Sequence, residues 1–289
     1  MSSPSRVWSG QLELEFTRRQ AKTWLSRSRV QAPLKVQRPF YPEGEAICHS
    51  VMLHTAGGIV GGDELAVNLL VHPEAQALVT TAAATKVYRS NGATAQQTVH
   101  IDVAAGACLE WLPQETIVFN GALYRQRLQV NLAANARWLG WEVTRLGRSA
   151  RGEQFQTGLW RSHIEVWQAG QLLWVDPQRV QGGSEMMHSP HGLAGCPVVG
   201  SLACLGQPIS PELVEKARQL WQPGADATIN ATINATVGVT RLQSGLLCRY
   251  RGTSTAAARH WFIQVWQLLR QDSLGSTRRS ACLPRVWQL

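Results

Sequence analysis

Hydrophobic and polar positions alternate in short runs over residues 8–199, and turn-forming residues separate the runs. Residues 11–17 alternate with the period of two that is typical of a half-buried strand. Residues 46–54 are more uniformly apolar, which predicts a strand covered on both faces. We expect further strands over residues 64–72, 77–82, 85–90, 94–103, 108–112, 115–119, 124–132, 137–145, 152–167 and 171–180.

The separators between these runs are rich in residues that favour turns. Asn-Gly and Ala-Gly steps occur at Asn91-Gly92, Ala105-Gly106, Asn120-Gly121 and Ala169-Gly170. Between alternating runs, such steps predict hairpins. An even spacing of roughly 8–12 residues between turns is typical of an all-β sandwich, a barrel or a β-helix-like stack.

Two segments near the C-terminus have helical periodicity. Ser210 is a suitable N-cap and Pro211 suits the first helical position, which predicts a helix over residues 210–221. A second helix is predicted over residues 254–270. We therefore expect a mainly β chain with two C-terminal helices, forming one domain over residues 1–289.

Residues 227–237, between the two helices, contain a four-residue Asn-Ala-Thr-Ile repeat. A period of four does not fit a strand and is too short for a solenoid. We expect a loop there, followed by a strand over residues 237–242.

The composition favours a packed core, with 44% hydrophobic and 16% charged residues. No apolar run reaches the roughly 18 residues that span a bilayer, and the N-terminus lacks the apolar core of a signal peptide. We therefore expect a cytoplasmic protein without a membrane partner. The six cysteines form no Cys-x-x-Cys pair, so buried thiols are expected.

The net charge of +9 permits a nucleic-acid-binding interpretation. However, the basic residues are scattered and no known nucleic-acid motif is present. A basic surface for an acidic protein partner fits equally well. Twelve tryptophans favour a protein that docks others, because tryptophan often anchors interfaces. We expect no nucleic-acid partner.

The segment from His54 to Asp63 contains four glycines and ends on a carboxylate. A phosphate-binding Walker loop would need lysine after its last glycine, where this chain has Asp63. A dinucleotide fingerprint would open a helix, whereas a strand is predicted over residues 64–72. The segment is therefore a connection between strands that presents Asp63, or a structural turn in which Asp63 is solvated.

Other carboxylates lie within or beside apolar runs, notably Glu142 between Trp141 and Val143, and Asp176 before Pro177. An acid in an apolar strand either points to solvent or lines a polar interior, where it needs a partner or water. The alternation of the strand favours solvent for Glu142.

A His188-Ser-Pro-His191 loop precedes Cys196 and Cys204. Imidazole and thiolate ligands suit a soft or borderline metal, although the spacing matches no standard site. This loop leaves a metal-dependent hydrolase open as an alternative function. Neither a Gly-x-Ser-x-Gly nor a His-Glu-x-x-His motif is present.

Several unusual motifs occur together and in a characteristic order. This order resembles that of the urease accessory protein family UreD, also called UreH, from about residue 10 to residue 288. The motifs are Gly57–Asp63, Thr80–Ser90, Leu109–Ile117, Gly140-Trp-Glu142, Leu146-Gly-Arg148, Arg151-Gly-Glu153-x-Phe155 and Pro284-Arg-Val-Trp287.

The resemblance implies a β-helix-like stack of strands with two helices near the C-terminus. It also implies a protein without catalysis of its own, which forms a complex with UreF and the GTPase UreG. That complex docks on the urease apoprotein and helps to insert nickel, which passes transiently through an internal tunnel lined by acidic residues.

By motif, Asp63 and Glu142 are the first candidates for the nickel route, and Thr85 and Asp176 are further ones. No tightly bound cofactor is expected. A transfer route should bind nickel weakly through oxygen ligands and water, because several thiolates or imidazoles would hold the ion.

Overall fold

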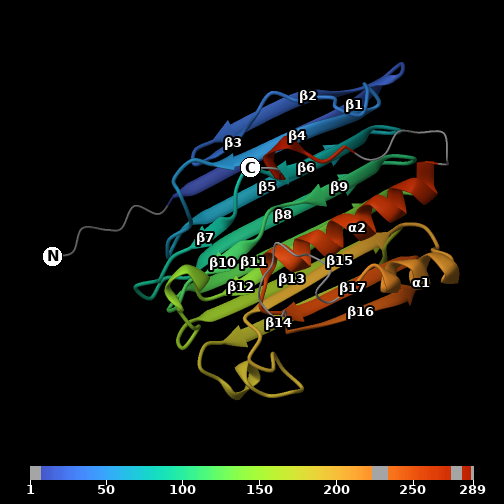
Figure 1. The fold of residues 1–289 in the computed structure, drawn as a ribbon. Helices are drawn as coiled ribbons and strands as arrows, with labels where there is room; N and C mark the ends of the chain where they lie inside the picture. Colours follow the sequence, from blue (N-terminus) through green and yellow to red (C-terminus); the bar gives the residue numbers. More distant parts are fainter. Residues whose placement is uncertain (1–7, 223–233, 275–281, 288–289) are drawn as a thin grey trace.

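The computed structural model describes residues 8–222, 234–274 and 282–287, which form two facing β-sheets and helices near the C-terminus (Figure 1). The seven-stranded sheet has the order β14-β13-β11-β8-β5-β1-β2. Its strands are β1 (Ser9–Arg19), β2 (Lys22–Gln31), β5 (Glu64–Val71), β8 (Ala95–Val103), β11 (Leu123–Leu132), β13 (Leu159–Gln168) and β14 (Gln171–Gln181).

The ten-stranded sheet has the order β16-β17-β15-β12-β9-β6-β4-β3, with β7 and β10 paired beside β12. Its strands are β3 (Leu34–Val36), β4 (Ile47–His54), β6 (Gln76–Thr81), β7 (Thr85–Val87), β9 (Cys108–Leu112), β10 (Thr116–Val118), β12 (Arg137–Leu146), β15 (Val198–Leu205), β16 (Ala235–Leu242) and β17 (Gly245–Gly252).

The chain winds between the two sheets as a β-solenoid of about four turns. β5, β8, β11 and β13 pair in parallel in one sheet, while β4, β6, β9 and β12 pair in parallel in the other. Each turn therefore contributes one strand to each sheet. The antiparallel strand β2 borders one end of the stack, and the antiparallel strands β14, β15, β17 and β16 border the other.

Alternating side chains fill the space between the sheets. In β5, Leu65, Val67, Leu69 and Val71 point inwards and are buried, while the intervening positions are more exposed. The same alternation in neighbouring strands places stacked hydrophobic side chains in one core cluster. The mainly β, β-helix-like fold expected from the resemblance is confirmed.

Both predicted helices are present. α1 (Pro211–Gln219) begins after Ser210, whose Oγ accepts a hydrogen bond from the amide of Leu213 at 3.2 Å. α2 (Thr255–Leu274) ends four residues beyond the predicted helix end at residue 270. The helices lie on the outer face of the ten-stranded sheet and share a second core cluster with it (Figure 1).

Other parts of the sequence prediction need correction. Most Asn-Gly and Ala-Gly steps are not hairpins, because the chain crosses to the other sheet after the turn; Ala169-Gly170, between β13 and β14, is a true hairpin. Within the predicted strand over residues 152–167, β13 starts only at Leu159, after the 3-10 helix Ser149–Arg151. The sequence pattern did not single out β2, β3, β15 or β17.

Further details concern single segments. Most of the repeat over residues 227–237 lies outside the described residues. Cys282 is exposed, so the expectation of buried thiols is wrong for this residue, whereas Cys48, Cys196, Cys204 and Cys248 are buried. No helix in the described ranges has the length and apolar character needed to cross a membrane.

A buried charge network attaches the last turns of α2 to the sheet. The guanidinium of Arg270 donates from Nε to Glu110 at 2.6 Å and from Nη2 to the same carboxylate, and it donates from Nη1 to Glu43. Glu43 also contacts Nε2 of His49 at 2.7 Å. These side chains are at most 9% exposed, and the hydrogen bond to His49 and the charge of Arg270 lower the pKa of Glu43 although its burial raises it.

We expect Arg270→Ala to destabilise the protein by about 3–5 kcal/mol, because it leaves two buried carboxylates without their cation. Urea unfolding measures the change. Arg29→Ala is the control: its guanidinium faces Glu13 at 3.9 Å on the surface, and its removal should cost about 1 kcal/mol or less. Equal losses from both variants would contradict the role of the buried network.

Candidate functional site

An interior cavity of about 390 Å³ lies between the two sheets. Its lining comes from both sheets and extends from His54 in β4 to Ser201 in β15. Tryptophan and aliphatic side chains make up much of the wall, including Trp111, Trp138 and Trp174. The polar residues of the lining include His54, Thr81, Thr85, Lys86, Gln97, Gln114, Gln126, Glu142, Ser162 and Ser201.

Glu142 is the carboxylate of the cavity wall. On the opposite side of β12, Trp141 and Val143 are buried in the cluster beneath α2. Because the helix covers the outer face of the strand, the alternation places Glu142 in the interior rather than in solvent. The sequence-based preference for a solvent-exposed Glu142 is therefore wrong.

A chain of hydrogen bonds crosses the cavity from one sheet to the other. Ser162 in β13 donates its hydroxyl to Oε2 of Glu142 at 2.9 Å, and Gln126 in β11 donates to the Ser162 hydroxyl at 3.2 Å. Oε1 of Glu142 is buried and has no hydrogen-bond partner within the described part of the protein. Ser162 therefore fixes one of the two carboxylate oxygens of Glu142.

The surroundings of Glu142 favour the neutral form of its carboxyl group. Burial raises the pKa of Glu142 to about 7, and the charge of Asp176 adds to the rise. The Ser162 hydrogen bond and the charge of Arg249 oppose it. A carboxyl with this pKa is ionised or protonated according to small changes around it, including the approach of a cation.

Asp63 lies at the end of the glycine-rich connection between β4 and β5 and is only 4% exposed. Its Oδ2 accepts a hydrogen bond from the amide of Val60 at 2.9 Å, while Oδ1 is buried without a partner in the described chain. The alternative of a turn with a solvated Asp63 is therefore wrong. Asp63 does not itself contribute to the cavity lining.

The glycines give this connection its close packing. Gly58 has φ +157°, and a Cβ there would lie 2.7 Å from the carbonyl oxygen of Lys86. The next residue, Ile59, donates its amide to that carbonyl at 2.7 Å. Only glycine therefore allows the loop to lie so near β7, where Gly57 and Gly58 line the cavity.

His54, at the other end of the connection, is a residue to which the sequence analysis gave no role. It lines the cavity, and both of its ring nitrogens are buried without a hydrogen-bond partner among the described residues. Burial lowers the pKa of His54, and the charge of Asp63 works in the opposite direction. In the sequence, the position of His54 at the start of the glycine-rich segment could have indicated this role. A neutral imidazole at this place can bind a cation.

The two further sequence candidates have different surroundings. Thr85 lines the cavity at the start of β7, and its amide donates to the carbonyl of Glu115 at 2.9 Å. Asp176 does not line the cavity: its carboxylate accepts two hydrogen bonds from Arg249, at 2.6 and 2.8 Å, and one from Gln178 at 2.9 Å. The Asp176–Arg249 ion pair joins β14 to β17, and hence one sheet to the other.

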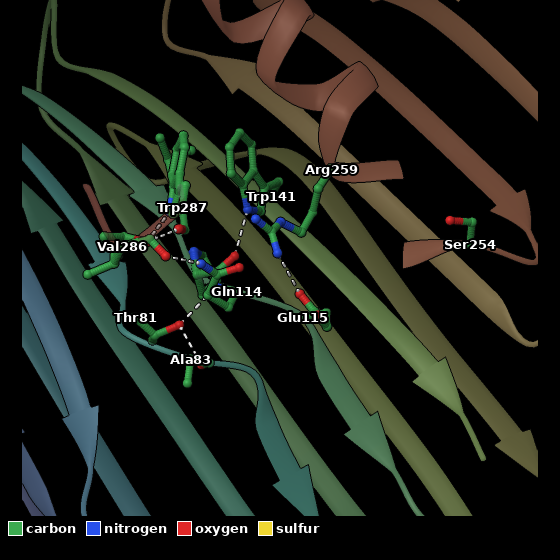
Figure 2. A network of polar contacts seen from close by, with 12 residues as sticks. Thr81, Ala83, Gln114, Glu115, Trp141, Ser254, Arg259, Val286 and Trp287 are labelled. Carbon is green, nitrogen blue, oxygen red and sulfur yellow. Dashed lines mark hydrogen bonds and ion pairs between the residues drawn. The ribbon is translucent and has the colours of Figure 1, made fainter. Parts of the chain in front are cut away.

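The segment after β9 forms a wall of the cavity that C-terminal residues hold in place (Figure 2). The backbone amide of Gln114 donates to Thr81 Oγ1 at 2.8 Å, and its side-chain amide donates to the carbonyl of Val286 at 3.4 Å. Arg259 in α2 pairs with Glu115 at 3.1 Å, as Figure 2 shows. The cavity wall therefore depends on α2 and on the 3-10 helix Arg285–Trp287.

The His188 and His191 side chains are exposed in a surface loop after the 3-10 helix Glu185–Met187. Arg251 anchors this loop by donating to the carbonyls of Pro190 and Gly192. Within residues 8–222, 234–274 and 282–287, no group of three or more His, Cys, Asp or Glu side chains has the arrangement of a metal site. What the cavity offers a cation is instead a few separate oxygen and nitrogen atoms.

Comparisons with known proteins agree over the whole chain. The family model described as UreD urease accessory protein matches residues 9–288. The chain is 58% identical over 282 residues to the urease accessory protein UreD of Nostoc punctiforme, covering 98% of this chain and 96% of that protein. It is 42% identical over 285 residues to that of Dechloromonas aromatica, covering 99% of this chain and 95% of the relative.

A family match of this extent, together with the solenoid, places the protein among accessory factors rather than enzymes. The metal-dependent hydrolase alternative is therefore wrong. The motifs that carried the resemblance also surround the cavity: the glycine-rich connection, the segment after β9, and Gly140-Trp-Glu142. The chain belongs to the UreD family of urease accessory proteins.

Proposed function

We propose that this protein acts in the cytoplasm with UreF and the GTPase UreG, binds the urease apoprotein, and helps to insert nickel by conducting the ion through its interior cavity. Its membership of the UreD family supports a role in urease maturation. The observation that carries the proposed route is the cavity between the sheets, whose wall holds a carboxylate oxygen of Glu142 that no described residue pairs with.

The proposed route has two groups of ligand atoms. At the first, His54 and Asp63 flank the glycine-rich connection, and the ring nitrogens of His54 and Oδ1 of Asp63 have no hydrogen-bond partner among the described residues. At the second, Glu142 offers Oε1, with Ser162 and Ser201 beside it in the lining. Thr85 lines the same cavity and adds a hydroxyl oxygen. Asp176 contributes through its charge, which acts on Glu142.

Separate groups of ligand atoms of this kind suit the transfer of a nickel ion better than its storage. Each offers one or two protein ligands, so water completes the coordination of the ion and the ion can leave. The elevated pKa of Glu142 also limits its charge until a cation approaches, because a buried carboxylate without a partner is costly. Under this proposal the protein binds Ni²⁺ transiently and holds no tightly bound cofactor.

We expect Asp63→Asn combined with Glu142→Gln to reduce urease activation at least tenfold. The amides keep the size of the side chains while removing their charge and weakening their affinity for a cation. The measurements are urease activity and nickel content of urease purified from cells that co-express all structural and accessory proteins. Co-purification of the variant with its partners shows that folding and assembly are intact.

Glu64→Gln is the matched control, because Glu64 follows Asp63 directly and is exposed at the start of β5. It should leave activation unchanged within about twofold. Full nickel content in urease matured by the Asp63→Asn/Glu142→Gln protein would refute the proposed route without affecting the family assignment.

The raised pKa of Glu142 predicts a pH dependence of stability. The folded state binds a proton more tightly than the unfolded state, whose carboxyl titrates at about 4.5, so stability falls as pH rises from about 4.5 to about 7. The Glu142→Gln variant lacks this contribution. The difference in unfolding free energy between wild type and variant should therefore change by about 1–3 kcal/mol over this range.

Urea unfolding of both proteins at several pH values measures this difference. A difference that stays constant between pH 4.5 and 7.5 would show that the folded protein does not raise the pKa of Glu142.

A further inference from the structure

Three arginines form a row across the outer face of the seven-stranded sheet. The parallel register of β11 and β13 places Arg125 opposite Arg161, and the antiparallel register of β13 and β14 places Arg161 opposite Arg179. Adjacent strands are about 4.8 Å apart, so the Cα atoms of the three arginines lie next to one another on a line across the strands. We call these three residues the arginine row; their strands lie side by side in Figure 1.

The row points away from the cavity. Tyr124, Trp160 and Val180, each adjacent in sequence to one of the arginines, are buried between the sheets. Since successive side chains of a strand point to opposite faces, the arginines are directed outwards. Arg125 and Arg179 are exposed, and Arg161 is half-buried between them.

No acid neutralises the row within the described residues. Arg127, one position further along the outer face of β11, pairs with Glu165 at 3.4 Å, and His163 lies 2.6 Å from the same carboxylate. Neither Arg125, Arg161 nor Arg179 has an ion pair with a described residue, and Nε of Arg161 is buried without a hydrogen-bond partner.

This arrangement opposes folding of the isolated chain. Like charges that face each other on adjacent strands are destabilising, and an unpaired buried donor adds a desolvation cost. An anionic partner would remove both effects. We propose that the arginine row is a docking surface for an acidic helix of a protein partner, laid across β11, β13 and β14.

The chemistry of the row favours carboxylates on a helix. A guanidinium binds a carboxylate through two parallel N–H groups. Acidic side chains three or four residues apart on a helix are about 5–6 Å apart, close to the spacing of the strands. The surface also offers apolar contacts, since Val175 and Leu172 on β14 are 42% and 45% exposed.

A nucleic acid fits this surface less well. Binding along a phosphate backbone relies on many basic contacts, about 6–10 in typical cases, whereas this row holds three arginines and Glu165 lies further along β13 on the same face. The exposed apolar side chains of β14 also match a protein rather than a chain of phosphates. Docking on the outer face of the sheet does not depend on the nickel route inside.

The test is binding of the full-length protein to a synthetic amphipathic helical peptide with glutamates four residues apart, measured by fluorescence anisotropy. We expect Arg125→Glu/Arg179→Glu to weaken binding at least tenfold. Lys35→Glu/Arg38→Glu is the matched control, because it makes the same change in net charge at two exposed positions in and after β3. The control should bind within about twofold of wild type.

A second measurement separates docking from a structural role. Arg125→Glu places a carboxylate opposite Arg161, so the free chain should keep or raise its melting temperature while peptide binding falls. Peptide binding unchanged in the double variant would overturn the proposal. So would equal binding of a peptide with glutamine in place of glutamate, or binding to single-stranded DNA and not to the acidic peptide.

Discussion

The in-register parallel pairing of strands in each sheet is the constraint on which the rest of the structure depends. A strand alternates its side chains between two faces, and a shift of one residue would exchange them. In β5, β8, β11 and β13, residues that pair with each other point to the same face of the sheet in every turn. Hydrophobic residues therefore stack inwards and polar ones outwards. The interior cavity and the outer arginine row are two consequences of one register, since Gln126 and Arg125 are adjacent residues of β11.

Polar residues interrupt an otherwise hydrophobic interior at the cavity. Glu142 and Ser162 come from opposite sheets and meet by a hydrogen bond of 2.9 Å, which ties the sheets together where Trp138 and Trp174 also line the space. Burial of this carboxyl opposes folding at neutral pH and is compensated by core packing elsewhere. A protein whose task is only to be stable would gain from an apolar residue here, so the cost argues for function.

The C-terminal elements make the interior possible. α2 covers the outer face of β12 with Trp261, Phe262 and Trp266, and its last turns are held by the Arg270 network. Residues 285–287 then close over the same sheet, where Trp287 lies 5.2 Å from Trp141 between ring centroids and donates to Thr80 at 2.9 Å. Because both faces of the ten-stranded sheet are covered, its inner face is free to carry polar groups without exposing them to bulk water.

The sequence by itself determined most of the strands, both helices and the family, and it singled out Asp63 and Glu142 as candidates, because periodicity, capping and motifs are local properties. Only the tertiary structure decided which sheet each strand joins, since Ala105-Gly106 and Ala169-Gly170 look alike as turns but lead to different sheets. It likewise decided that Glu142 faces a cavity, that Asp176 is paired with Arg249, and that the ring nitrogens of His54 have no hydrogen-bond partner in the described part of the chain. Such facts rest on contacts between residues far apart in the chain, which no local pattern encodes.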